Sequence, residues 1–80
     1  MNKEYKLETE NIGSQLKFLA SVRGYTMVQL KEKINNTYGK TDWVRNLSNK
    51  VKNKTLRVSE LAEIATVLGY EIILKEKSSQ

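Results

Sequence analysis

Apolar residues recur at helical spacing in four short blocks of this 80-residue chain. No other feature of the sequence constrains the fold as strongly. In the first block Ile12, Leu16 and Leu19 stand at i, i+4 and i+7, which places them on one face of a helix. The later blocks repeat the pattern with Met27, Leu30 and Ile34, then Val44, Leu47 and Val51, then Leu61, Ile64, Ala65 and Leu68. We therefore expect a mainly α fold, with four helices around one core, because a chain this short makes a single domain.

Capping residues predict where the first two helices begin and end. The first is expected over residues 10–23, with Thr9 or Asn11 as its cap and Gly24 ending it. The second begins after Thr26, which forms a capping-box pattern with Gln29. Its apolar pattern fades at two consecutive asparagines, so residues 36–41 are interpreted as a long loop.

The third helix is expected over residues 42–52, capped by Thr41 or Asp42. The fourth is expected to begin after Ser59 and to end at Gly69, so the helical core spans residues 10–69.

Short β-strands are expected at the two ends of this core. Residues 70–75 are rich in β-favouring side chains and alternate weakly, which predicts a short strand followed by a polar tail over residues 76–80. Residues 1–9 form either a loose arm or a short strand through Tyr5 and Leu7. Because an exposed strand edge tends to be paired, the 70–75 strand is expected to pair with this arm or with a second chain.

The net charge of +5 is local rather than global. Residues 40–57 hold six basic residues and one acid, a net +5, whereas the rest of the chain holds eight of each and sums to zero. A solvated helix face is the ordinary explanation of a lysine-rich segment. A basic cluster on one face is also the electrostatic signature of phosphate binding, and we favour that explanation here.

Several function classes are excluded or disfavoured by what the chain lacks. It contains no His and no Cys, and it has no glycine-rich phosphate loop, so we expect no enzyme activity, no metal site and no cofactor. Its longest apolar run is three residues, which is too short for a membrane span or a signal peptide. We therefore expect a cytoplasmic protein.

Four segments together resemble the phage-repressor/Cro-like (Xre-type) helix-turn-helix family. They are Leu16-Lys17-Phe18-Leu19, Arg23-Gly24-Tyr25-Thr26, Asn46-Leu47-Ser48-Asn49-Lys50-Val51 and the closing segment from Leu61 to Tyr70. The resemblance covers roughly residues 12–70. Three positions depart from the family pattern: Met27 stands where many members have Gln, Lys31 where a small Ala is usual, and the 36–41 loop is longer than the family's turn.

The resemblance implies a bacterial or phage transcriptional regulator, such as a repressor, that binds double-stranded DNA and is therefore nucleoid-associated. Its third helix, residues 42–52, would enter the major groove. Base readers are expected to be Arg45, Asn46 and Asn49, since Arg pairs with guanine and Asn with adenine through two hydrogen bonds. The predicted phosphate contacts are Lys40, Thr41, Ser48, Lys50, Lys52, Asn53 and Lys54. Trp43 is more typical of a core residue than of a DNA contact, and Asp42 of a cap.

One recognition helix makes few base contacts, so the resemblance also implies a homodimer. The expected dimer interface is the 70–75 strand, through Tyr70, Ile72, Ile73 and Leu74. An alternative function is a protein-binding module, such as the antitoxin of a toxin–antitoxin pair or a subunit of a larger regulatory complex. In that case the strand and the basic face would bind a toxin or another protein.

Overall fold

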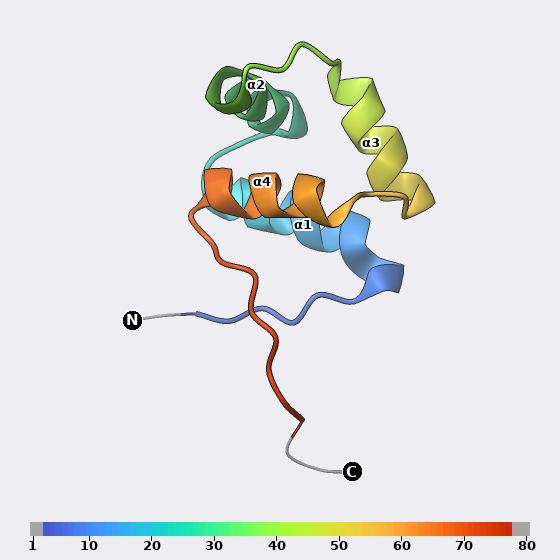
Figure 1. The fold of residues 1–80 in the computed structure, drawn as a ribbon, viewed down its shortest axis with the longest axis vertical. Helices are drawn as coiled ribbons and strands as arrows, with labels where there is room; N and C mark the ends of the chain where they lie inside the picture. Colours follow the sequence, from blue (N-terminus) through green and yellow to red (C-terminus); the bar gives the residue numbers. More distant parts are fainter. Residues whose placement is uncertain (1–2, 78–80) are drawn as a thin grey trace.

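The computed structural model describes residues 3–77, and within that range it is mainly helical with no β-strand. A short 3-10 turn, η1 (Thr9–Asn11), leads into the first helix (Figure 1). The four helices are α1 (Ile12–Val22), α2 (Met27–Tyr38), α3 (Val44–Asn53) and α4 (Val58–Leu68). The expectation of four short helices is confirmed for this part of the chain.

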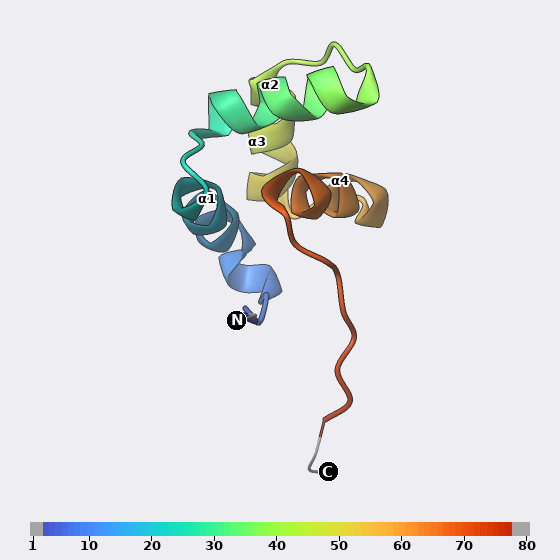
Figure 2. The same ribbon diagram turned by 90° about the vertical axis from the view of Figure 1, so that its left-hand side faces the viewer.

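The helices pack around one centre, and α3 lies at the edge of the group. Figure 2 shows α2 crossing above the other helices, with α1 and α4 on either side below it. In Figure 1, α3 descends at the right-hand side from the turn that follows α2. This placement leaves a large part of the α3 surface in contact with solvent.

The core is built from the predicted apolar faces. Leu30 is fully buried, and Leu16 and Ile64 are nearly so. The other buried apolar residues are Leu19, Ala20, Ile34, Leu47, Val51 and Leu68. Since each fully buried Leu or Ile side chain contributes about 1.5–3 kcal/mol, these faces are the main stabilising feature of the fold. Met27, Ile12 and Leu61 pack at the border of the core and are half-buried.

The predicted start of α2 is confirmed in detail. The Gln29 backbone N–H donates to Thr26 Oγ1 at 3.2 Å, and the Thr26 backbone N–H donates to Gln29 Oε1 at 2.9 Å. Two unpaired N–H groups of the first turn are thereby satisfied by side chains. Gly24 and Gly69, predicted to end α1 and α4, both adopt the left-handed conformation, with φ of +84° and +82°.

The predicted loop over residues 36–41 is wrong at its start, because α2 continues to Tyr38. Gly39 then ends the helix with φ of +66°, and the connection to α3 is residues 39–43. Asparagine is a poor helix former, which is why the pattern fades at Asn35. Its side chain instead donates a hydrogen bond at 2.8 Å to the backbone oxygen of Asp42, a tertiary contact that favours the longer helix.

The caps predicted for the other helices are also corrected. Asn11 precedes α1 but makes no side-chain capping bond. Helix α3 begins at Val44, with Trp43 in the cap position, so the expected caps Thr41 and Asp42 both lie before its start. Helix α4 begins at Val58, so Ser59 lies inside it. Its entry is closed by Glu60, whose Oε1 accepts from the Arg57 backbone N–H at 2.8 Å.

The strand predicted at residues 70–75 does not form within the part of the chain that the structure describes. Residues 71–77 leave the bundle as an extended segment, and Figure 2 shows it separate from the N-terminal arm. The two segments meet through side chains only: the Tyr5 and Tyr70 rings pack edge to face, with 6.0 Å between centroids, and Lys75 Nζ lies 3.6 Å from Glu4 Oε1. Tyr70 is half-buried because the Arg23 guanidinium also covers its ring, 4.7 Å from the centroid.

Across residues 3–77, no helix combines the length and apolar character that crossing a lipid bilayer requires.

Candidate nucleic-acid interface

The turn between α2 and α3 is held by a buried lysine. Lys31 is only 7% exposed, and its Nζ lies 3.3 Å from Asp42 Oδ2. Asn35 holds the backbone of the same aspartate from the next turn of α2. A hydrogen bond to its own backbone and the contact with Lys31 lower the pKa of Asp42, so its carboxylate stays charged. These contacts fix the start of α3 relative to the core.

Asn35 also keeps one polar atom unpaired. Its Oδ1 is buried and accepts no hydrogen bond from residues 3–77. Burial of an unpaired acceptor is unfavourable, so Asn35 is stabilised by only part of its side-chain amide.

Helix α3 divides into a buried side and an exposed polar side. Leu47 and Val51 are buried against the core, and Val44 is half-buried. Counting 100° per residue, the opposite side carries only polar residues, all of them exposed. They are Arg45, Asn46, Asn49, Lys52 and Asn53, which we call the outer face of α3. The structure thus presents all three predicted base readers on one exposed surface, with Ser48 exposed at its border.

Two of the six basic residues in the 40–57 segment are neutralised by α4. Lys40 Nζ lies 2.5 Å from Glu63 Oε1, and Lys50 pairs with Glu60 Oε2. The hydrogen bond with Glu63 raises the pKa of Lys40. The hydrogen bond from Lys50, followed by that from the Arg57 backbone, lowers the pKa of Glu60. The structure therefore gives these two predicted phosphate contacts a role in joining α4 to the α2–α3 unit.

The remaining cations of the segment are Arg45, Lys52, Lys54 and Arg57, which are exposed and form no ion pair within residues 3–77. Lys54 ends α3 in the left-handed conformation, with φ of +58°, at the one non-glycine position of that range with a positive φ. No carboxylate lies on the outer face of α3. The free positive charge of the segment is thus gathered around the exposed side and the C-terminal end of one helix.

Trp43 is not a core residue, contrary to the sequence-based expectation. It is 78% exposed, immediately before the first turn of α3. Asp42 next to it is bound to α2 by Lys31 and Asn35. Thr41 is exposed in the same turn. The surface around the start of α3 therefore includes a large, solvent-facing aromatic ring.

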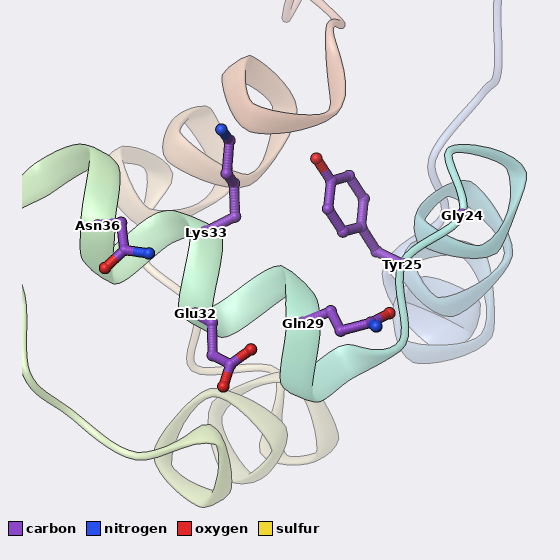
Figure 3. Close-up of a pocket in the computed structure, with 6 residues that line it drawn as sticks. All are labelled: Gly24, Tyr25, Gln29, Glu32, Lys33 and Asn36. Atoms are coloured by element: carbon purple, nitrogen blue, oxygen red, sulfur yellow. The ribbon is translucent and has the colours of Figure 1, made fainter.

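A separate depression lies along α2 and is open and polar. Gly24, Tyr25, Gln29, Glu32, Lys33 and Asn36 line its volume of about 300 Å³. Figure 3 shows Lys33 pointing toward α4 and Glu32 pointing to the α3 side of the helix. Because acids and bases are mixed here, this depression lacks the single-sign surface that the outer face of α3 has.

The ion pairs of Lys40 and Lys50 were missed by the sequence interpretation, although a signal for them exists. Glu60 and Glu63 stand at i and i+3, so a helix presents them on one side. Acids on that side of α4 can pair with lysines of the segments packed beside it, here Lys40 and Lys50. Arg57 was also left out of the predicted site, yet it is exposed and close in sequence to the C-terminal end of α3.

Comparison of this chain with models of known protein families, with curated proteins and with solved structures finds no match.

Proposed function

We propose that this protein binds double-stranded DNA sequence-specifically, as a small transcriptional regulator, with α3 in the major groove. The observation that carries the proposal is the outer face of α3: exposed, free of carboxylates and rich in Arg, Lys and Asn. A helix of about 10–12 Å diameter fits a major groove about 12 Å wide. Protein–DNA interfaces are more polar and more positively charged than protein–protein interfaces, which agrees with this composition.

Arg45, Asn46 and Asn49 are the proposed base readers. Arg45 donates two parallel hydrogen bonds to guanine O6 and N7, and either asparagine pairs with adenine N6 and N7. Asparagine is a poor choice inside a helix, where Ala, Lys or Glu would be more stable. Two solvent-facing asparagines in α3 are explained if that side is used for recognition.

The phosphate contacts are proposed to come from the residues around these readers. Lys52, Lys54 and Arg57 carry the free positive charge, while the polar side chains of Asn53, Ser48 and Thr41 donate hydrogen bonds. Lys40 and Lys50 contribute less than their charge suggests, because Glu63 and Glu60 already bind them. Trp43 is proposed to pack against a thymine methyl group beside the first turn of α3, because its ring is exposed there.

The decisive experiment is a titration of fluorescently labelled mixed-sequence DNA with the full chain at 50 and 200 mM salt. We expect binding that weakens steeply with salt, because each phosphate contact releases counterions. Selection of bound fragments should then yield a preferred sequence. Absence of binding at the lower salt concentration would reject the proposal.

A matched pair of variants separates the α3 face from general positive charge. Lys52→Ala and Lys33→Ala each remove one exposed lysine, but Lys33 points away from α3 toward α4 (Figure 3). Lys52→Ala should weaken binding to every sequence and reduce the salt slope by roughly one, whereas Lys33→Ala should change neither. Equal losses from the two variants would contradict the assignment of α3 as the binding surface.

A further inference from the structure

Two acids of α4 bind lysines that lie at the border of the candidate interface. Glu60 and Glu63 stand one turn apart on α4. Lys50 of α3 pairs with Glu60, and Lys40 of the preceding turn pairs with Glu63. Both lysines belong to the 40–57 segment that holds the net charge of the chain. The acids therefore occupy part of the positive charge that phosphates would otherwise bind.

Lys50 is placed beside the proposed base readers. Counting 100° per residue, it lies about 40° around α3 from Asn46 and one turn further along the helix. Phosphates flank the major groove, so a lysine at the border of the outer face is in a suitable position for a phosphate contact. Its ammonium group ends a flexible four-carbon stem. It can therefore turn from one anion to another without movement of the helix.

The two acids lie deeper than the lysines that they bind. The side chains of Glu60 and Glu63 are 18% and 20% exposed. Those of Lys50 and Lys40 are 38% and 32% exposed. Glu60 is also held by the Arg57 backbone N–H, at 2.8 Å from its Oε1. Because salt screens partly buried pairs less than exposed ones, a DNA phosphate has to compete with a fixed carboxylate for each lysine.

We propose that Glu60 and Glu63 compete with DNA phosphates for the two lysines that they bind, and thereby keep the sequence-independent affinity for DNA low. The inference rests on the proposed function and concerns the strength of binding at the same surface. Phosphate contacts supply essentially all non-specific binding, whereas base contacts discriminate between sequences. With two lysines withheld, a larger share of the binding free energy comes from base contacts, and binding depends less on salt.

Ion pairs that only join α4 to the α2–α3 unit would have the opposite effect on binding. Their loss would loosen the position of α3 and weaken the affinity for DNA. Competition predicts instead that loss of the acid strengthens binding. Glutamine is the suitable replacement at Glu60, because its amide oxygen still accepts a hydrogen bond from the Arg57 backbone. The start of α4 is thus retained while the charge is removed.

The test is a titration of labelled mixed-sequence DNA with the full chain and its Glu60→Gln variant, at 50 and 200 mM salt. Glu60→Gln should lower the dissociation constant roughly fivefold or more at 50 mM salt, because Lys50 is released to a phosphate. One further phosphate contact adds about 0.9 to the salt slope, so the gain should be about threefold smaller at 200 mM. Glu63→Gln should give a gain of the same sign through Lys40, which tests the second pair independently.

Two double variants of equal net charge show whether the gain depends on Lys50. Glu60→Gln/Lys50→Ala removes the released lysine and should return the dissociation constant to within about twofold of the wild type. Glu60→Gln/Lys33→Ala retains Lys50 and should keep the gain. Glu76→Gln is a control for loss of an acid, because Glu76 is exposed on the segment that runs away from α3 in Figures 1 and 2. It should change the dissociation constant less than about twofold.

The possible outcomes separate this inference from the proposed function. All variants should keep the helical circular dichroism of the wild type. Binding by the wild type without a gain in Glu60→Gln and Glu63→Gln, or equal affinity of the two double variants, would overturn the inference and leave the proposed function standing. A loss of affinity in Glu60→Gln would assign its ion pair a structural role alone. Absence of binding by the wild type and every variant at 50 mM salt would reject the proposed function and the inference with it.

Discussion

Lys50 and Lys52 are two positions apart on α3, yet their surroundings are opposite. Lys50 turns toward α4 and pairs with Glu60, whereas Lys52 is exposed without an ion pair in the described range. Two residues of a helix are separated by about 160° around its axis, which accounts for the difference. The local charge of +5 therefore comes from two kinds of basic residue. Some are lysines whose ion pairs join the helices, and the others are exposed cations that can contact a ligand.

The largest expected effect on DNA affinity is at Arg45, which is one of the exposed cations without an ion pair in the described range. Arg45→Ala should lower the affinity for the preferred DNA sequence by about 1–3 kcal/mol and relax the preference at one base pair. Affinity for mixed-sequence DNA should fall much less, because the lost contact is to a base and the phosphate contacts remain. The measurement is competition binding of the variant against a set of single-base changes in the selected site. An equal loss on all sequences would place Arg45 on a phosphate instead.

Lys50→Ala tests the same comparison through the free energy of unfolding. Removing Lys50 breaks its ion pair with Glu60, and a partly exposed pair of this kind contributes about 0.2–1 kcal/mol to the free energy of unfolding. Lys52→Ala should change the free energy of unfolding by less than that, while having the larger effect on DNA affinity. Urea unfolding and DNA titration of both variants measure the two quantities. A larger loss of affinity in Lys50→Ala than in Lys52→Ala would reverse the assignment.

The same comparison predicts a loss of stability at low pH. Glu60 is held charged in the folded state, chiefly by Lys50, so its pKa lies below the ordinary value of 4.5. A lowered pKa contributes stability that is complete above about pH 4.5 and is lost as the pH falls through the folded-state value. Glu60→Gln should therefore flatten the decrease of unfolding free energy below pH 4.5. An unchanged slope in Glu60→Gln would contradict the role given to the ion pair with Lys50.

The smallest expected effect on stability is at Trp43. Because the side chain is 78% exposed, Trp43→Ala should change the free energy of unfolding by no more than about 0.5 kcal/mol. As the single tryptophan of the chain, it also reports on the proposed interface. Iodide should quench its emission strongly in the free protein and less in the presence of DNA. Strong protection from iodide in the free protein would contradict the exposed position.

Local chemistry explains which parts of the fold were predictable from sequence. The capping box of Thr26 and Gln29 and the left-handed Gly24 and Gly69 depend on residues within a few positions, and all were predicted correctly. The apolar faces that form the core depend only on helical periodicity, and they were predicted equally well.

The errors arise where a distant residue decides the local structure. Asn35 lies inside α2 and reaches Asp42 across the turn, and Trp43, next to that aspartate, is exposed instead of buried. Residues 71–75 have the side chains of a strand but no partner strand in the described chain, so propensity alone predicted a strand that the fold does not form. In the candidate site, the exposed side of α3 followed from helical geometry, whereas the pairing of Lys40 and Lys50 required the position of α4.

The left-handed backbone at Lys54 has a consequence for how this protein responds to selection. A residue with a Cβ atom is disfavoured by roughly 1–2 kcal/mol in that conformation, whereas glycine adopts it freely. Selection for thermal resistance alone would thus favour Lys54→Gly. Selection for DNA binding would oppose this change if the ammonium group of Lys54 contacts DNA. Thermostable descendants obtained without a binding requirement should lose this lysine early, and those obtained with it should keep the lysine and gain their stability elsewhere.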